Sequence, residues 1–400
     1  MKRILFITSR NIFTTCGEIR LIKNRAEAMY NYYRIPTDFL AIAKTERINA
    51  PIKENIEAGG SIKGICTTLI NPISVMRSLN ELKKITKERI MSGEYGAVVL
   101  SGTGPQVLAK TIRKYSNIKI IVDCHGASET TEEALRKYSA LGKIWHRLIS
   151  RTDRFLLKKG FRYFDACFVV SPALKEYLIK KYNICSKVRF FDVPCATTQP
   201  INIDDYERYR EEFRHKYEID SDEKVFIYSG GVSSWQCIEE TVDLYKSIRK
   251  TINTKSRFLI FSHMRKEIQK ITENDNEIMI DSYSPEILER ALCAGDYAFL
   301  LRRKSIINTV AFPNKYLEYV KSGMKIITTP YINEIARQVE ENGIGYIYDF
   351  DKDDGHIIDY IKQDSINKKE MIKKAETILE YNGFKRRLQE VADYIMKGEN

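Results

Sequence analysis

The sequence lacks long apolar runs and low-complexity tracts. Its longest apolar runs, such as Ile4–Ile7 and Tyr297–Leu301, are the length of strands, whereas a membrane-spanning helix needs about 18 apolar residues or more. The apolar stretch after Met1 is too short for a signal peptide. The chain contains 24 tyrosines and 17 phenylalanines beside 30% charged residues. This aromatic content excludes a chain that is mainly disordered.

Cysteine and histidine are also scarce. Eight cysteines and five histidines are scattered over 400 residues, and the closest cysteines, Cys185 and Cys195, are ten positions apart. No Cys/His cluster has the spacing of a zinc site, and a disulfide framework is not expected. The acidic run 351–354 has no partner cluster, so we interpret it as a solvated loop and predict no metal. These features indicate a reduced, cytoplasmic protein.

Positive charge is concentrated in one segment. The chain has 65 basic and 53 acidic residues, a net charge of +12, and Arg136–Arg162 holds nine basic residues against Asp153 alone. Apolar pairs at i, i+4, such as Ile144 and Leu148, predict a basic amphipathic helix or helix pair there. Such a surface suits anionic lipid headgroups or a phosphorylated partner; the alternative is a solvated helix without a partner. No zinc-finger, RRM or KH signature accompanies it, so nucleic-acid binding is not expected.

Short apolar runs alternate with helical periodicity along the whole chain, as in parallel βαβ units. The predicted strands of the first half are Ile4–Thr8, Asp38–Ile42, Ala97–Leu100, Lys119–Asp123, Ala166–Val170 and Val188–Phe191. Those of the second half are Lys224–Tyr228, Phe258–Phe261, Ile278–Ile280, Tyr297–Leu301 and Lys325–Thr328. A Pro-bounded segment, 194–200, and a charged stretch, Asp204–Lys216, separate the halves. The pattern predicts an α/β protein with two doubly wound, Rossmann-like domains, 1–200 and 201–380, facing a cleft.

Two loops that follow predicted strands are candidate phosphate sites. Ser9–Gly17 leads from the first strand into a helix predicted over Arg20–Tyr33, and its free backbone N–H groups could face an anion. In the second half, Gly230 and Gly231 follow a strand and lead to Gln236, and paired glycines permit close backbone approach. An ordinary crossover loop and a simple tight turn are the respective alternatives.

A third loop carries more chemistry. It runs from Leu300 through Asn308, and Pro313 then stands where the first residue of a helix is expected. Asn314 and Lys315 would lie in the first helical turn, beside exposed N–H groups that suit a diphosphate. Glu318 could accept hydrogen bonds from two vicinal hydroxyls of a ribose or sugar. The alternatives are a surface charge for Lys315 and a solvated helix residue for Glu318.

At this loop the sequence resembles glycosyltransferase family 4 of the GT-B glycosyltransferases. VAFPNKYLEYVKSGMKIITT is similar to that family's P-x-K-x-x-E-Y-x-x-x-G segment, and LLRRKSIIN resembles a branch of bacterial surface-polysaccharide enzymes. YSGGVSSWQCIEE, FVVSPALKEYL and VDCHGA also resemble family segments, in order along the chain. The resemblance implies a retaining, metal-independent transferase that moves a sugar from a nucleotide-sugar donor to a lipid-linked or polysaccharide acceptor. The setting it implies is capsule, exopolysaccharide or O-antigen synthesis, at the inner face of the cell membrane if the protein is peripheral.

The resemblance also implies roles for individual residues. Glu318 would hold the ribose, and residues from Asn308 to Lys315, including Pro313 and Asn314, would meet the diphosphate. Gly230, Gly231 and Gln236 would line the donor site, Gly17 would lie near the diphosphate and acceptor, and His125 near the donor sugar. Residues 381–400 would form a helix that packs back on the first domain.

Two departures from the family pattern matter. Many members carry an Arg and a Lys after the first strand of the second domain, where this chain has Ser233 to Gln236. Many also have a second Glu seven or eight residues before Glu318. Positive charge for the leaving diphosphate must then come from elsewhere, and the candidates are Arg302, Arg303 and Lys315.

Two other functions fit the same architecture. A nucleotide-sugar 2-epimerase would need a set of acids and histidines for proton transfer, and five dispersed histidines argue against it. A catalytically degenerate binding protein is the second alternative, kept open by the missing Arg/Lys pair. His125 could also be a structural histidine, and Asp123 could cap a turn.

Overall fold

A computed structural model describes most of the chain, in two units. The described residues are 2–9, 12, 17–43, 53–55, 57–66, 72–102, 104–127, 139–194, 200–273, 275–352 and 355–397. The first unit combines the described residues up to position 194 with 384–397, and the second comprises those from 200 to 383. Arg136 and Lys137, part of the basic segment, lie outside the described residues.

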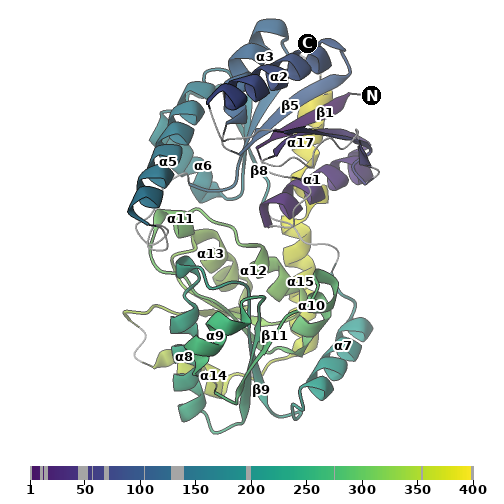
Figure 1. Cartoon of the computed structure of the whole chain (residues 1–400). Coiled ribbons are helices and arrows are strands. Elements are labelled where there is room, and N and C mark those ends of the chain that lie inside the picture. Colours follow the sequence, from purple (N-terminus) through teal and green to yellow (C-terminus); the bar gives the residue numbers. More distant parts are fainter. Residues whose placement is uncertain are drawn as a thin grey trace. The chain divides into compact units, whose positions relative to one another are not determined.

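The first unit is built on a sheet of eight described strands (Figure 1). The strands follow the order β3-β4-β2-β1-β5-β6-β7-β8, and all neighbours are parallel except β3 and β4. The strands are β1 (Arg3–Thr8), β2 (Thr37–Ala43), β3 (Lys53–Asn55), β4 (Gly60–Cys66), β5 (Tyr95–Ser101), β6 (Lys119–Cys124), β7 (Ala166–Val169) and β8 (Arg189–Asp192). The helices are α1 (Gly17–Tyr33), α2 (Pro72–Met91), η1 (Pro105–Leu108), α3 (Ala109–Tyr115), α5 (Ala140–Gly160), α6 (Pro172–Tyr182), α16 (Phe384–Arg387) and α17 (Gln389–Met396).

The second unit has a six-stranded parallel sheet in the order β11-β10-β9-β12-β13-β14. Its strands are β9 (Lys224–Ser229), β10 (Ser256–Phe261), β11 (Ile278–Asp281), β12 (Tyr297–Leu300), β13 (Lys325–Thr328) and β14 (Gly345–Ile347). Its helices are α7 (Ile203–Lys216), η2 (Ser234–Gln236), α8 (Ile238–Thr251), α9 (Arg265–Thr272), α10 (Pro285–Ala291), η3 (Leu292–Ala294), α11 (Ile306–Thr309), α12 (Asn314–Lys321), α13 (Asn333–Asn342), α14 (His356–Gln363) and α15 (Lys368–Asn382).

The two parallel sheets confirm the predicted α/β class, and the predicted strands coincide with observed ones to within two residues. Three strands were not predicted: β3, β4 and β14. In β4, Gly60 lies so close to β2 that a Cβ atom would be 2.0 Å from the carbonyl oxygen of Thr37. Glycine is required there because the two backbones approach closely. Because glycine has no apolar side chain, it interrupts the alternation of apolar residues by which a strand is predicted from sequence.

The charged stretch between the two halves, Asp204–Lys216, forms the helix α7. Asn202 caps α7 by accepting a hydrogen bond from the backbone N–H of Asp205 at 2.8 Å. Acidic residues lie in the first turn of the helix and basic residues in the last. This placement matches the helix dipole, so the charges at both ends stabilise the helix.

An aromatic core lies against one face of the sheet in the second unit. The ring of Phe226 on β9 stacks on those of Tyr297 and Phe299 on β12, with centroids 5.1 and 5.5 Å apart. On this face α8, α9 and α14 contribute buried apolar residues to the same cluster. The core therefore holds β9 and β12 rigidly side by side, and the loops that follow these two strands carry most of the predicted donor-site residues.

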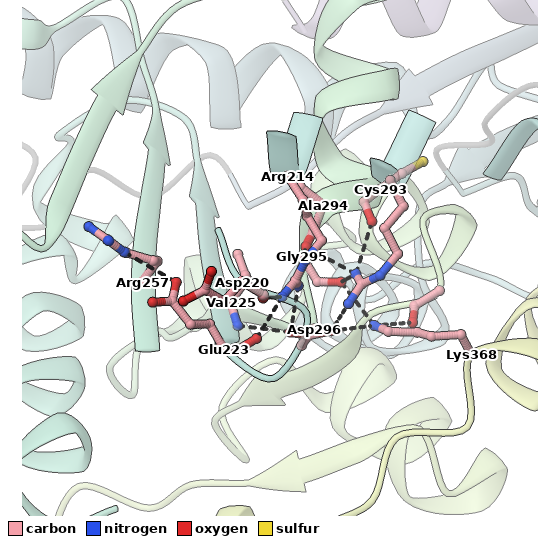
Figure 2. A network of polar contacts seen from close by, with 12 residues as sticks. Arg214, Asp220, Glu223, Val225, Arg257, Cys293, Ala294, Gly295, Asp296 and Lys368 are labelled. Carbon is pink, nitrogen blue, oxygen red and sulfur yellow. Dashed lines mark hydrogen bonds and ion pairs between the residues drawn. The ribbon is translucent and has the colours of Figure 1, made fainter. Parts of the chain in front are cut away.

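A buried carboxylate, Asp296, lies at the amino-terminal end of β12 and is in contact with three cations (Figure 2). The Oδ1 atom of Asp296 lies 2.8 Å from Arg210 and 3.1 Å from Lys368, and its Oδ2 atom lies 3.4 Å from Arg214. Oδ2 also accepts the backbone N–H of Val225 at 2.8 Å. Burial alone would raise the pKa of Asp296, but Lys368 and the arginines lower it to about 2. The network fastens α7 and the start of α15 to the sheet.

The C-terminal helices belong to the first unit. The hydroxyl of Tyr33 on α1 donates to the carbonyl of Lys385, and the Lys119 ammonium donates to the carbonyl of Lys397 at 2.6 Å. The rings of Phe191 on β8 and Tyr394 on α17 lie 5.3 Å apart. No helix in the described part of the chain combines the length and apolarity needed to cross a bilayer.

We expect the substitution Asp296→Asn to destabilise the second unit by about 3–5 kcal/mol, because it leaves three buried or half-buried cations without a carboxylate. Urea denaturation of the whole chain, followed by tryptophan fluorescence and circular dichroism, measures the loss. Asp220→Asn is the control, since Asp220 forms an exposed ion pair with Lys255 at 3.1 Å and its removal should change little. Equal losses in the two variants would contradict the role given to Asp296.

The same carboxylate makes the stability depend on acid. The pKa of Asp296 is lowered from 3.8 to about 2 in the folded protein, so its stabilising effect is fully present above pH 3.8 and is lost as the pH falls towards 2. The free energy of unfolding of Asp296→Asn should therefore fall less steeply than that of the wild type in this pH range.

Candidate functional site

The loops after β9 and β12 meet at the carboxyl edge of the second sheet, where parallel α/β sheets bind ligands. Gly230 and Gly231 follow β9 directly, and Arg302 is the second residue after β12. The N-terminal turn of α12, which carries Lys315, lies against the glycine loop. The structure thus brings together Gly230, Gly231, Gln236, Arg302 and Lys315.

Gly230 is required by both its backbone and its surroundings. Its φ angle is +136°, a region that L side chains rarely adopt. A Cβ atom on Gly230 would lie 2.0 Å from the Nζ atom and 2.5 Å from the Cε atom of Lys315. The missing side chain therefore makes the space in which the Lys315 ammonium rests.

The Lys315 ammonium is held by polar but uncharged groups. Its Nζ donates to the Oε1 atom of Gln236 at 2.5 Å and lies 4.5 Å from the centre of the Tyr228 ring, a cation–π contact. The Tyr228 hydroxyl lies 2.7 Å from the same Gln236 oxygen and 2.6 Å from the carbonyl oxygen of Gly231. These contacts fix the position of the Lys315 amine, and none of them supplies a negative charge.

Arg302 is buried on the same side and also contacts Gln236. Its Nη1 atom donates to the carbonyl oxygens of Leu301 at 2.8 Å and Gln236 at 3.3 Å. Its backbone N–H donates to the Thr329 hydroxyl at 3.1 Å. Burial lowers the pKa of Arg302 below its usual value, although an arginine remains protonated at neutral pH.

Electrostatically, the site is short of negative charge. Burial and the neighbouring Arg302 lower the pKa of Lys315 well below its usual value, and Glu318 offsets this only in part. Among the described residues neither Lys315 nor Arg302 forms an ion pair with a carboxylate. Two cations without a paired carboxylate at a strand edge are an arrangement that favours an anionic ligand.

The third candidate cation, Arg303, is already paired. Its Nε atom lies 2.9 Å from the Oε1 atom of Glu240, and its guanidinium stacks on the ring of Phe350 at 4.7 Å. Its side chain is about half exposed. Arg303 therefore offers less uncompensated charge than Lys315 or Arg302.

The predicted loop between Arg302 and Pro313 contains a short helix, α11. Asn308 lies in it and is 2% exposed, and its side-chain amide donates to the carbonyl of Arg303 at 2.8 Å. The side chain of Asn308 thus closes the loop. Pro313 is the residue that precedes α12, and Asn314 is its first residue. The prediction of Pro313 as the first helical residue is therefore wrong by one position, because its ψ of 131° is extended.

Glu318 lies in the middle of α12 and is half-buried. The next residue, Tyr319, is fully buried, and its hydroxyl accepts the backbone N–H of Ser229 at 2.8 Å. This hydrogen bond ties α12 to the end of β9 and sets the distance between the glycine loop and Lys315. Sequence reasoning missed Tyr319 and Tyr228 because tyrosines inside apolar runs are typical core residues.

In the first unit, His125 follows β6 and is held by a buried carboxylate. Its Nε2 atom lies 2.7 Å from the Oδ2 atom of Asp123, and the Nη1 atom of Arg25 on α1 lies 2.7 Å from Oδ1. Gly17 is the first residue of α1. Most of the loop before Gly17, residues 10, 11 and 13–16, lies outside the described residues.

The described part of the basic segment is the helix α5, and an exposed apolar stripe runs along it. Its exposed large apolar residues, with exposed fractions from 37% to 80%, are Leu141, Ile144, Trp145, Leu148, Ile149 and Phe155. Basic residues recur beside them at intervals of three or four, and these are Lys143, Arg147, Arg151, Arg154 and Lys158. The Ser139 hydroxyl caps the helix, and Leu157 and Gly160 anchor its last turn in the unit.

Known structures share this architecture along the whole chain. The chain is 13% identical to sucrose-phosphate synthase from Thermosynechococcus elongatus, with 98% of both chains covered and a TM-score of 0.70. It is 10% identical to WaaG, a glycosyltransferase involved in lipopolysaccharide biosynthesis, with 99% of this chain and 100% of that chain covered and a TM-score of 0.63. A structure from E. coli, described as trehalose-6-phosphate bound with UDP-2-fluoro glucose, is 10% identical over 100% of both chains with a TM-score of 0.65.

These similarities show the fold, which is GT-B, as predicted from the sequence. No protein-family model matches the chain, and no curated protein matches it either. What the site does must therefore be argued from its own residues.

We expect Gly230→Ala to disturb the site while Gly231→Ala leaves it intact. The new methyl at position 230 would collide with Lys315 and force a positive φ on alanine, at a cost of more than about 1 kcal/mol. At position 231 the nearest atom to a new Cβ would be the Met264 sulfur at 3.5 Å, an ordinary contact. Thermal unfolding of both variants checks this, and equal melting temperatures would show that Lys315 does not rest against Gly230.

Proposed function

We propose that this protein is a glycosyltransferase that moves a sugar from a nucleotide-sugar donor to an acceptor. The observation that carries the proposal is the pair of cations, Lys315 and Arg302, whose hydrogen-bond partners are neutral oxygens at the carboxyl edge of the second sheet. The GT-B fold supports it, and one structure of this fold is described as bound with UDP-2-fluoro glucose.

The chemistry of the transfer explains why such a pair would be useful. When the bond between sugar and diphosphate breaks, negative charge grows on the leaving diphosphate and the sugar becomes oxocarbenium-like. Cations and N–H groups that are already in place stabilise this charge without reorganising. In the proposal, Lys315, Arg302 and the first turn of α12 with Asn314 face the diphosphate. Gly230 and Gly231 let the backbone approach it closely.

Glu318 is proposed to bind the ribose of the donor. It lies on the same helix as Lys315, one turn further on, so both side chains project from one side of α12. A carboxylate accepts two hydrogen bonds from vicinal hydroxyls, which distinguishes a ribose from a deoxyribose. Lys315 and Glu318 would therefore bind adjacent parts of one nucleotide.

Retention of configuration, independence of a metal ion and the acceptor class also belong to the proposal. They rest on the resemblance to glycosyltransferase family 4, and the fold is shared with WaaG, a glycosyltransferase involved in lipopolysaccharide biosynthesis. Lys315, Arg302 and the helix start would supply the charge that a metal supplies elsewhere. The acceptor is then a lipid-linked or polysaccharide glycan of the bacterial surface.

A lipid-linked acceptor fits the exposed surface of α5. Its apolar stripe, which includes Leu141, Trp145 and Leu148, would bury itself in a membrane interface. The neighbouring basic stripe would attract anionic headgroups at about 1 kcal/mol per charge. We propose that α5 lies on an anionic membrane surface while the enzyme works on its acceptor.

A direct test incubates the protein with labelled nucleotide sugars and undecaprenyl-linked glycan acceptors. Transfer of the label to the acceptor supports the proposal. An isomerised donor without transfer would instead identify a 2-epimerase, and unchanged donors across the panel would leave only a binding protein. A thermal-shift panel of nucleotides and nucleotide sugars selects the donors to label.

We expect Lys315→Met and Glu318→Gln each to weaken nucleotide-sugar binding by about 10- to 100-fold, the loss of one charge-assisted hydrogen bond. Isothermal titration calorimetry with the donor selected above measures the affinity. Lys304→Met is the matched control, because Lys304 is an exposed lysine of the same loop. Unchanged affinity in both site variants, or an equal loss in the control, would remove the proposed donor site.

Neutralising Arg147, Arg151, Lys158 and Lys159 should reduce binding to vesicles of phosphatidylglycerol and phosphatidylcholine by more than about tenfold at low salt. The difference should shrink as salt screens the charges. A second variant, with Leu141, Trp145 and Leu148 changed to serine, should lose binding at all salt concentrations. Sedimentation with vesicles measures both variants.

The charge-matched control neutralises four exposed lysines of the second unit: Lys250, Lys266, Lys270 and Lys304. It should bind vesicles as the wild type does. If the control loses as much binding as the α5 variants, net charge explains the attraction and α5 is not the membrane surface.

A further inference from the structure

The order of strands in the second sheet reverses between β9 and β12. From β9 the chain adds β10 and β11 on one side, and β12, β13 and β14 follow on the other side. In open α/β sheets, ligands bind at such a switch point, outside the carboxyl ends of the strands. The topology therefore favours ligand binding between the ends of β9 and β12, where Gly230 and Arg302 follow the two strands.

The two strands part before they end. Among the described residues, β9 and β12 pair at two positions, and the second of these joins Ile227 to Ala298. β9 stays paired with β10 as far as Ser229, and β12 stays paired with β13 as far as Leu300. Ser229 is 3% exposed, and a buried N–H group without an acceptor is costly. The end of β9 therefore needs a hydrogen-bond acceptor that β12 does not supply.

A side chain of α12 supplies this acceptor. The hydroxyl of Tyr319 accepts the backbone N–H of Ser229 at 2.8 Å and the Ser229 hydroxyl at 3.2 Å. Tyr319 is fully buried, and burial raises the pKa of its hydroxyl to about 12, so the phenol is uncharged at neutral pH. One phenol thus joins α12 to the sheet at the switch point.

Lys315 and Tyr319 contact two consecutive residues at the end of β9. They are four residues apart on α12, so their side chains project from the same face, one turn apart. Tyr319 bonds Ser229, and Lys315 rests against Gly230, where a Cβ atom would lie 2.0 Å from its Nζ atom. These two contacts fix the rotation of α12 and its position along β9. The place of the Lys315 amine therefore depends on the Tyr319 hydroxyl.

The glycine loop itself is held by the sheet. The N–H of Gly230 donates to the carbonyl of Phe261 on β10 at 2.9 Å. The hydroxyl of Tyr228 on β9 donates to the carbonyl of Gly231 at 2.6 Å. The loop therefore keeps its place without α12, and loss of the Tyr319 contact would shift the helix rather than the loop.

A second tyrosine of α12 shows that burial alone does not explain the contact. Tyr316 is also fully buried, but its hydroxyl has no hydrogen-bond partner in the described part of the chain. Its ring packs against that of Phe312, with centroids 5.9 Å apart. Tyr316 thus packs as an apolar residue, whereas Tyr319 is hydrogen-bonded to the sheet. The helix therefore contains a matched control for the Tyr319 hydroxyl.

We propose that Tyr319 is a positioning residue, which sets the place of Lys315 for a diphosphate by bonding Ser229 at the switch point. The inference rests on the function proposed above, which brings a diphosphate to Lys315. Two observations besides the resemblance favour an anion there: the switch point, and the absence of an ion pair between a carboxylate and Lys315 or Arg302 among the described residues. A cation that is already in place stabilises an anion without reorganising.

The position of Lys315 is measured first, on the whole chain, without a ligand. Its Nζ atom lies over the face of the Tyr228 ring, 4.5 Å from the centre, so the ring current should move its Hε signals upfield of those of an ordinary lysine. NMR of ¹³C-labelled lysine detects these signals, which are identified by their loss in Lys315→Met. Tyr319→Phe keeps the ring, removes the hydroxyl and should move the signals towards the ordinary position, whereas Tyr316→Phe should leave them unchanged.

Two results of this measurement overturn the proposal. One is a Tyr319→Phe variant whose Lys315 signals keep their wild-type position. The other is a wild-type Lys315 with signals at the ordinary lysine position, and this result decides even if Tyr319→Phe does not fold.

Anion binding is measured second, by isothermal titration calorimetry with inorganic pyrophosphate and with the donor that the thermal-shift panel selects. Tyr319→Phe should weaken binding by about tenfold, because a misplaced group loses part of its interaction, and Tyr316→Phe should bind as the wild type does. Since Tyr319 acts through Lys315, adding Tyr319→Phe to Lys315→Met should weaken binding by less than about twofold more.

Wild-type affinity in Tyr319→Phe overturns the proposal, and so does a double variant in which the two losses multiply. A purely structural role would lower the melting temperature and leave the affinity of the folded protein unchanged. If the wild type binds neither pyrophosphate nor any donor, the proposed function fails, whereas the NMR result still decides whether Tyr319 sets the position of Lys315.

Discussion

The Lys315 ammonium, resting on Gly230 and beside Arg302, is the interaction on which the proposed chemistry depends. A charged amine is placed where burial and a second cation both disfavour its charge, and it is held there by an amide oxygen and an aromatic ring. The fold must therefore offset an unfavourable arrangement in the free protein. A diphosphate would relieve that cost on binding, and more strongly as its charge grows during bond cleavage.

At the amino-terminal end of β12, around Asp296, the second unit has a contrasting arrangement of charges. Around Asp296 three cations converge on one carboxylate, and the arrangement is complete without a ligand. Around Gln236 two cations converge on neutral oxygens, and negative charge is missing. Both sites rest on the rigid aromatic core of β9 and β12. The difference between a structural network and a candidate binding site is whether the counter-charge is built into the chain.

The sequence predicts much of this fold because the apolar runs of parallel strands are short, distinct and regularly spaced. Gly230 and Lys315 are both recognisable as candidates, since one follows a strand and the other begins a helix. Their contact is not predictable, because it depends on Tyr319 tying α12 to Ser229 across 90 positions of sequence. The pairing of Arg303 with Glu240, which separates it from the other two cations, likewise depends on tertiary packing.

The missing Arg/Lys pair of the family pattern can now be interpreted in physical terms. Where those members carry cations, this chain has Gln236, whose side-chain oxygen receives Lys315 and whose backbone oxygen receives Arg302. A lysine at position 236 would add a third cation beside two that already repel each other, and it would remove the acceptor that orients Lys315. The glutamine and the two cations are therefore one arrangement. At this edge of the sheet, the positive charge comes from the β12 loop and α12, and the β9 loop supplies the oxygens that receive it.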